Sequence, residues 1–153
     1  MNFNKLTNAV LLGLLVNQPV GFSAPVIDPN DPNSTLIDNT SVVNSTFINQ
    51  QTQNLSLQWN SFNINSNETV TFVQPNTSSM VVNHINSLDV STIAGQLNAN
   101  GQIVLINPNG LIFSEGSVVN VGGIVASGLN INSEAFLNGS AFLNHEQNSD
   151  ELA

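Results

Sequence analysis

The side chains best suited to catalysis or metal binding are few and widely separated. The chain has two histidines, His84 and His145, ten Asp and Glu residues, a single Lys and no Cys. Neither histidine has an Asp or Cys at the spacing of a metal site or a nucleophilic triad. The scattered acids do not form the pair that sugar cleavage requires. We therefore predict no catalytic residue, no metal site and no cofactor, and the chain is not expected to be an enzyme.

The overall charge restricts the kinds of partner. The 153 residues carry a formal charge of −9, and only 7% of them are charged. Without clusters of Lys and Arg a surface cannot neutralise phosphate groups, so direct binding to nucleic acid or anionic lipid is excluded. The absence of Cys excludes disulfides and thiolate chemistry. With 27 Asn, the surface is instead expected to consist of neutral hydrogen-bonding side chains.

Residues 1–24 have the pattern of a secretory signal peptide. Lys5 precedes the apolar run 9–16, which is followed by Pro19 and by small residues at 21, 23 and 24. The run is too short to span a bilayer, and a buried helix is the structural alternative. We expect an N-terminal signal helix here, whose removal leaves no Lys or Arg in the exported chain.

The elements that follow are expected to be short strands. The polar lead 25–35 repeats Asp-Pro-Asn, which forbids a helix and favours turns, with a calcium loop as the alternative. Beyond it, 42–43, 55–57, 62–64 and 70–73 alternate apolar with polar residues or form short apolar groups between Asn and Ser clusters. The expected core residues are Trp59, Phe62, Ile64, Phe72, Ile103, Leu105, Phe113 and Val121.

From residue 91 onward, apolar groups of two to four residues alternate with Asn and Gly corners. Such brief strands favour an all-β parallel β-helix, in which amide side chains stack along the corners. A sandwich or barrel would have longer strands and clearer hairpin turns. The residues Asn107, Pro108, Asn109 and Gly110 predict a rigid turn, because Asn accepts from the backbone, Pro presets φ and Gly permits a left-handed exit.

Several spaced motifs together resemble one family, the haemagglutination-activity or two-partner secretion domain of filamentous-haemagglutinin-like exoproteins. The motifs lie at 59–64, 70–75, 93–113 and 119–127, and the Trp-x-x-Phe-Asn-Ile segment is most similar to the high-molecular-weight adhesin branch. By this resemblance, Asn107, Pro108, Asn109 and Gly110 match the family's secretion motif. Relatives usually carry Asn-Arg-Val where this chain has Asn83, His84 and Ile85.

The resemblance implies a right-handed parallel β-helix with short extra strands or hairpins. It also implies that residues 36–153 form a secretion-address and folding-nucleus domain, which we expect to be incomplete at its C-terminal end. Its implied partners are the general secretory machinery and an outer-membrane β-barrel transporter of the TpsB type with periplasmic POTRA modules. The implied destination is the cell surface or medium, reached through the periplasm and outer membrane. The implied cargo is an adhesin that meets a host-cell receptor through a region beyond residue 153.

Two alternatives to an adhesin remain. The cargo is either an adhesin or an iron-acquisition protein that binds a haem carrier, and a polysaccharide-cleaving β-helix is the less supported enzyme alternative.

Seven Asn-x-Ser/Thr sequences also mark candidate glycosylation sites, a small excess that composition nearly explains. They are Asn33, Asn39, Asn44, Asn54, Asn67, Asn76 and Asn138.

Overall fold

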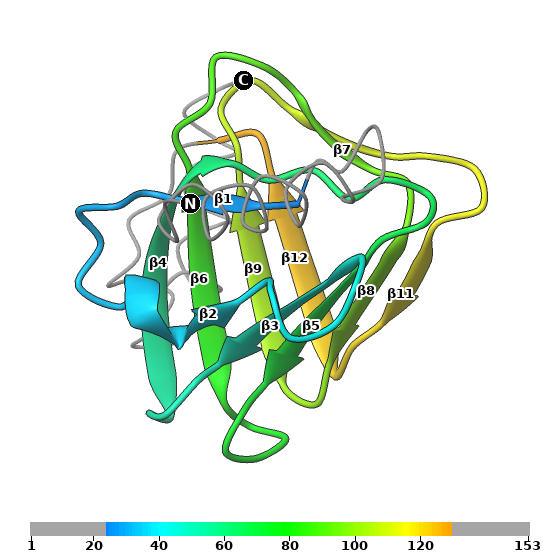
Figure 1. Ribbon diagram of the computed structural model, residues 1–153. Coiled ribbons are helices and arrows are strands. Elements are labelled where there is room, and N and C mark those ends of the chain that lie inside the picture. Colours follow the sequence, from blue (N-terminus) through cyan, green and yellow to red (C-terminus); the bar gives the residue numbers. More distant parts are fainter. Residues whose placement is uncertain (1–23, 130–153) are drawn as a thin grey trace, which may run out of the picture.

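Parallel strands wound into a solenoid make up most of the fold. The computed structural model describes residues 24–129, which contain twelve strands and one short 3-10 helix, η1 (Ser34–Leu36). Figure 1 shows the strands in layers that face one another. The expected all-β parallel β-helix is confirmed, whereas the expected signal helix lies outside the described residues except for Ala24.

The strands form three sheets. Sheet A consists of β1 (Val26–Ile27), β4 (Asn54–Ser61), β6 (Met80–Ile85), β9 (Gln102–Ile106) and β12 (Gly123–Ser127). Sheet B consists of β2 (Ile37–Asp38), β3 (Ser45–Asn49), β5 (Thr69–Val73), β8 (Gln96–Ala99) and β11 (Val118–Asn120). Sheet C pairs β7 (Ser91–Ile93) with β10 (Leu111–Phe113), and a bridge joins Ile64 to Ile93.

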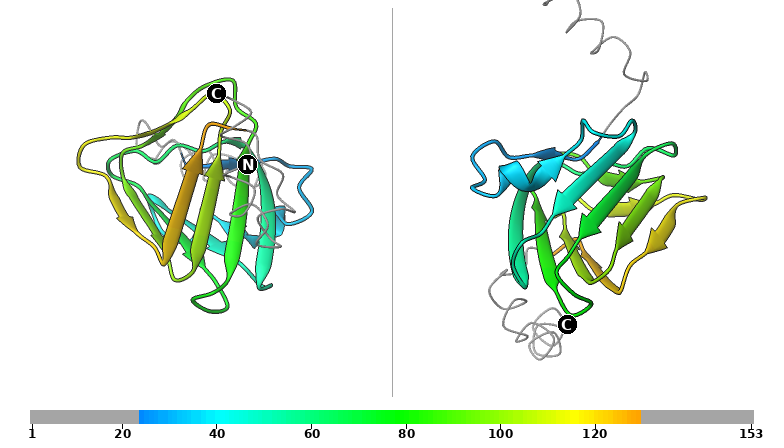
Figure 2. Two further views of the ribbon diagram at one scale, coloured as in Figure 1. Left: turned by 180° about the vertical axis from the view of Figure 1, so that it is seen from behind. Right: turned by 60° about the horizontal axis from the view of Figure 1, so that its bottom comes forward.

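Each turn of the solenoid, here called a coil, runs from sheet B through sheet A to sheet C. Coil 1 contains β3, β4 and Ile64, coil 2 contains β5 to β7, coil 3 contains β8 to β10, and coil 4 contains β11 and β12. Equivalent positions in sheet B are Ser45, Thr69, Gln96 and Val118, so successive coils advance by 24, 27 and 22 residues. Figure 2 shows equivalent strands of successive coils side by side.

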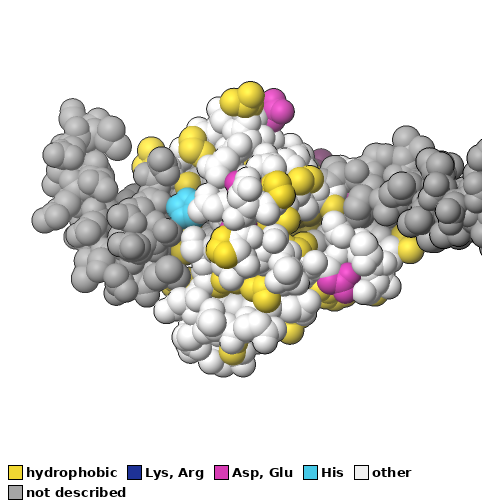
Figure 3. All heavy atoms as spheres, turned by 60° about the vertical axis from the view of Figure 1, so that its left-hand side comes forward, with side chains coloured by type: hydrophobic (Ala, Val, Ile, Leu, Met, Phe, Trp, Pro, Cys, Tyr) yellow, Lys and Arg dark blue, Asp and Glu magenta, His cyan; other side chains and the backbone are white. Residues whose placement is uncertain are grey.

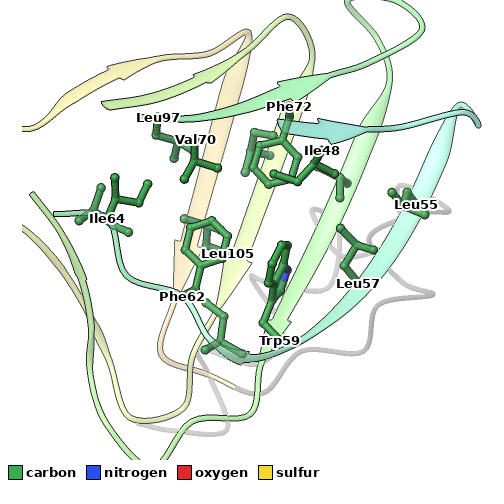
Figure 4. Packing of buried hydrophobic residues seen from close by; sticks show 14 residues of the cluster. Ile48, Leu55, Leu57, Trp59, Phe62, Ile64, Val70, Phe72, Leu97 and Leu105 are labelled. Atoms are coloured by element: carbon green, nitrogen blue, oxygen red, sulfur yellow. The ribbon is translucent and has the colours of Figure 1, made fainter. Parts of the chain in front are cut away.

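The core lies between the sheets because each strand turns alternate side chains inward. In β4, Leu55, Leu57 and Trp59 are buried while the residues between them are partly exposed. Figure 4 shows side chains from the opposed layers meeting in the interior. The Trp59 and Phe62 rings meet edge to face with centroids 5.2 Å apart, a favourable aromatic geometry.

Six of the eight expected core residues are fully buried, a seventh is partly buried, and the eighth, Phe113, corrects the prediction. Trp59, Phe62, Ile64, Phe72, Ile103 and Leu105 have exposures of 0–1%, and Val121 is partly buried against the core. Phe113 is 39% exposed although it is paired in register with the buried Ile93. It faces inward from the last strand of sheet C among the described residues, so no further strand of that sheet covers it.

Antiparallel strands cover the first coil. β1 pairs with β4, and β2 pairs with β3, both antiparallel. The buried Asp31 carboxylate holds the polar lead to sheet A by accepting from Gln58 N at 2.7 Å and Asn33 N at 2.7 Å. The lead thus contains turns, as expected, and also a short strand and η1. The expected strand at 42–43 is wrong, since Val42 and Val43 lie in an exposed turn before Asn44, whose φ is +56°.

An amide ladder lies at the corner between sheets B and A. Gln74 Nε2 donates to Gln50 Oε1 at 3.1 Å, and Gly101 N donates to Gln74 Oε1 at 2.8 Å. Gln50 Nε2 in turn donates to the Met80 carbonyl at 3.0 Å. The expected stacking of amides along a corner is therefore present, with buried Gln in the positions predicted for Asn.

Candidate functional site

The 107–110 corner forms the predicted turn between β9 and β10. Gly110 N donates to Asn107 O at 2.9 Å, which closes the turn, and Asn109 N donates to Asn107 Oδ1 at 2.9 Å. Gly110 has φ +104°, in the region that favours glycine. Asn107 and Gly110 therefore have the local roles that their types predict, and the chain passes sharply from sheet A to sheet C.

Asn107 connects three coils through its hydrogen bonds. It is completely buried, and its Nδ2 donates to Asp89 O at 3.0 Å and to Ser91 Oγ at 2.9 Å, both in coil 2. Its backbone N donates to Ser127 O at 3.0 Å in coil 4. Removing this amide would leave buried partners unsatisfied, which costs about 1–3 kcal/mol for each such group.

The other corner residues face solvent. Pro108 and Asn109 are exposed, and Asn109 Nδ2 donates to Ser87 O at 2.6 Å. Gly110 O accepts from Ser91 N at 3.0 Å. The corner is thus bonded to the connection that precedes β7, and Figure 1 shows the two connections together at the top of the molecule.

The titratable groups do not converge on this corner. Within residues 24–129, no group of three or more His, Asp and Glu side chains is placed to hold a metal ion. His84 lies outward on β6, where partial burial lowers its pKa and favours the neutral ring. His145 lies outside the described residues. Figure 3 shows one face of the molecule, on which acidic side chains are few and dispersed among neutral ones.

A buried polar contact that the sequence pattern does not predict lies beside the aromatic core. Trp59 Nε1 donates to Asn83 Oδ1 at 2.9 Å, and Asn83 Nδ2 donates to Val104 O at 3.1 Å. In the sequence, Asn83 stands out only as part of the 83–85 segment. Its place between valines and an isoleucine in β6 was the available signal, because an inward Asn in such a strand needs buried partners.

The candidate glycosylation sites are dispersed over the surface. Asn39, Asn54, Asn67 and Asn76 are exposed, and Asn33 and Asn44 are partly buried. The Asn76 amide donates to Gln53 Oε1 at 2.7 Å and is therefore already engaged. Asn138 lies outside the described residues.

Comparison with known proteins identifies the family. The model of the TPS secretion domain, the domain of two-partner secretion, matches residues 26–153. The chain belongs to the TPS secretion domain family. In the part that the structure describes, no helix is long and apolar enough to cross a membrane.

A solved structure and two curated proteins are similar to this TPS chain. The crystal structure of the HMW1 secretion domain from Haemophilus influenzae is similar at 35% identity and a TM-score of 0.60, covering 67% of this chain and 27% of that one. Two heme/hemopexin-binding proteins of H. influenzae are 38% and 37% identical over 78 and 70 residues. The matches cover 51% and 46% of this TPS chain but only 9% and 8% of those relatives.

Proposed function

We propose that this TPS domain is the secretion address and folding nucleus of an exoprotein, and that the 107–110 corner is the part on which this role depends. The observation that carries the proposal is Asn107, whose fully buried side chain and backbone link coils 2, 3 and 4. A residue with this many interlocked hydrogen bonds sets the local stacking of the solenoid. The corner therefore acts by fixing the shape of the address, with Pro108 and Asn109 at its exposed side.

The proposed route passes through the general secretory machinery and then through a TpsB-type outer-membrane barrel with POTRA modules. Family membership supports this route. The composition also suits it, because a chain without Cys and with few charges meets little obstacle in passing extended through a barrel. Strands of successive described coils pair 22–27 residues apart, and non-local pairing of this kind is slow, so coils that have not yet stacked would remain extended during transport.

The proposed cargo is a surface adhesin, and haem-carrier binding is the second candidate. Resemblance of the 59–64 segment to the high-molecular-weight adhesin branch supports the first, and likeness to the heme/hemopexin-binding proteins supports the second. Erythrocyte or epithelial-cell binding by the complete exoprotein, set against pull-down of a haem carrier, distinguishes the two. A polysaccharide-cleaving activity is less supported, because the acids of the described coils are dispersed, and an assay of polysaccharide cleavage tests it directly.

Secretion of an Asn107→Ala variant tests the proposed address. The exoprotein and its transporter are produced together, and the protein is measured in the medium and the periplasm. We expect Asn107→Ala to accumulate or be degraded in the periplasm, whereas Asn60→Ala, at an exposed amide on β4, is secreted normally. Normal secretion of Asn107→Ala would refute the role of the corner.

A further inference from the structure

The connection between β6 and β7 carries the most exposed large hydrophobic side chain in the described part of the chain. Leu88 is 94% exposed, and Val90 is 38% exposed. Single exposed leucines are common, so exposure alone assigns no role. Leu88 differs because the backbone on both sides of it is fixed.

Both asparagines of the corner hold the peptide groups beside Leu88. Asn109 Nδ2 donates to Ser87 O at 2.6 Å, and Asn107 Nδ2 donates to Asp89 O at 3.0 Å. Asp89 N also donates to Ser87 Oγ at 3.0 Å. The loop is therefore ordered before any partner binds, so binding does not carry the conformational entropy cost of ordering it.

The apolar surface of this loop adjoins the corner itself. Val90 Cγ2 lies 3.8 Å from the position that a Cβ on Gly110 would occupy, and Ile112, two residues further, is 52% exposed. Asp89 is exposed between Leu88 and Val90, and residues 24–129 contain no Lys or Arg. Figure 3 shows hydrophobic and acidic side chains together at the top of the molecule, the end at which Figure 1 places this loop. A partner surface complementary to this loop would have an apolar pocket with a positively charged rim.

We propose that Leu88 and Val90 enter such a pocket in a periplasmic module of the transporter, and that Asn107 and Asn109 act as positioning residues for this loop. The proposal rests on the proposed function in two-partner secretion. In the folded coils Asn107 is fully buried and cannot contact a partner protein, whereas Leu88 exposes almost all of its surface. The contact requires coils 2 and 3 to be paired, so the address is folded while the rest of the exoprotein is extended.

Binding of the 153-residue chain to the purified periplasmic module of its transporter tests the contact. We expect Leu88→Asn to weaken binding roughly 10- to 100-fold, the effect of withdrawing one leucine from an apolar pocket. Leu88→Met, which preserves the apolar volume, retains binding within about threefold. Val43→Asn is the matched control, because Val43 is also highly exposed, at 76%, but precedes β3 of sheet B. Equal urea midpoints for Leu88→Asn, Leu88→Met and Val43→Asn establish that these three variants fold as the native chain does.

The outcomes separate this inference from the proposed function. If the native chain binds the module and Leu88→Asn binds equally well, the loop contact is refuted and the address function stands. If the native chain is neither bound nor secreted through the transporter, the proposed function itself fails. The double variant Leu88→Asn with Asn107→Ala examines positioning, because a shared role makes the two losses less than additive. Fully additive losses would refute the positioning role of Asn107.

Discussion

At the scale of single residues, buried amides interrupt the lines of inward-facing apolar residues that are paired in register from one coil to the next. Asn83 lies in register between Leu57 of coil 1 and Leu105 of coil 3, and both leucines are fully buried. Its two hydrogen bonds, from the Trp59 ring and to the Val104 carbonyl, satisfy both ends of the amide. A buried polar group with this many bonds fixes the register of the coils around it.

Replacement of Asn83 should therefore destabilise the fold. In Asn83→Leu the Trp59 Nε1 hydrogen loses its buried acceptor, and we expect a loss of about 1–3 kcal/mol in the free energy of unfolding. The chain has a single Trp, so urea denaturation followed by Trp59 fluorescence reports the change at the site. Asn86→Ala, at an exposed residue beyond β6, should change the free energy by less than about 0.5 kcal/mol. An Asn83→Leu variant with the same free energy of unfolding as the native chain would show that the amide does not stabilise this part of the core.

Asp38 should make stability depend on acid pH. Hydrogen bonds from the Ser41 side chain and from the Thr40 and Ser41 backbone amides lower the pKa of Asp38 from 3.8 to about 2. The folded pKa is below the unfolded one, so the contribution to stability is present above about pH 4 and is lost as the pH falls through about 2. Asp38→Asn should thus be less stable than the native chain near neutral pH, and the two should converge below pH 2. A difference in urea midpoint that is independent of pH would contradict this.

At the scale of elements, corners rather than strands distinguish this solenoid. The strands repeat one pattern of inward and outward residues, whereas each corner needs its own close contacts. At the corner between sheets B and A, a Cβ on Gly101 would lie 2.6 Å from Ser79 O and 2.9 Å from Gln74 Oε1. At the 107–110 corner, a Cβ on Gly110 would meet only Val90 Cγ2, at 3.8 Å.

Alanine at these two glycines should have different consequences. Gly110→Ala suffers only the backbone strain of a positive φ, about 1 kcal/mol. Gly101→Ala forces the Ser79 backbone and the Gln50–Gln74 ladder apart, so we expect a loss of about 3 kcal/mol or more. Urea denaturation of the two variants measures the difference. Equal losses would indicate that the corner between sheets B and A relaxes easily.

Local sequence predicts the strands better than the contacts between coils. Alternation over 54–61 and the turn residues of 107–110 predict the observed elements, because both signals are local. Val42 and Val43 mislead, since two adjacent valines do not show whether a neighbouring strand exists. Phe113 has the inward orientation that its pattern predicts, yet its burial depends on a following coil.

The candidate site could be predicted only in part for the same reason. The type and order of Asn107, Pro108, Asn109 and Gly110 indicate the turn. The partners of the turn lie 16–22 residues earlier, at Ser91, Asp89 and Ser87, and no local pattern specifies the length of the coil that brings them together. Only these hydrogen bonds show that the backbone beside the exposed Leu88 is held in place.

At the scale of the whole molecule, the two ends of the described solenoid differ. Antiparallel β1 and β2 pair with the first coil, and the Asp31 carboxylate holds the chain across it. Inward-facing side chains of coils 3 and 4 remain partly exposed at the other end: Phe113 by 39%, Val119 by 38% and Ile124 by 38%. In a solenoid each coil gains its stability from its neighbours, so stability should decrease from the first coils toward the fourth.

Ile103 and Ile124 test this gradient within one row. They are register partners that follow Leu55 and Val81 on the inner face of sheet A, but Ile103 is 1% exposed and Ile124 is 38% exposed. Ile103→Asn places an amide in the closed core and should cost roughly 4 kcal/mol or more, a large part of the stability of a typical domain. Ile124→Asn should cost about 1 kcal/mol, because its amide still reaches water. Urea denaturation monitored by Trp59 fluorescence, with hydrogen exchange of the β12 amides, separates the two; equal losses would mean that a further coil or a second copy covers the fourth coil in solution.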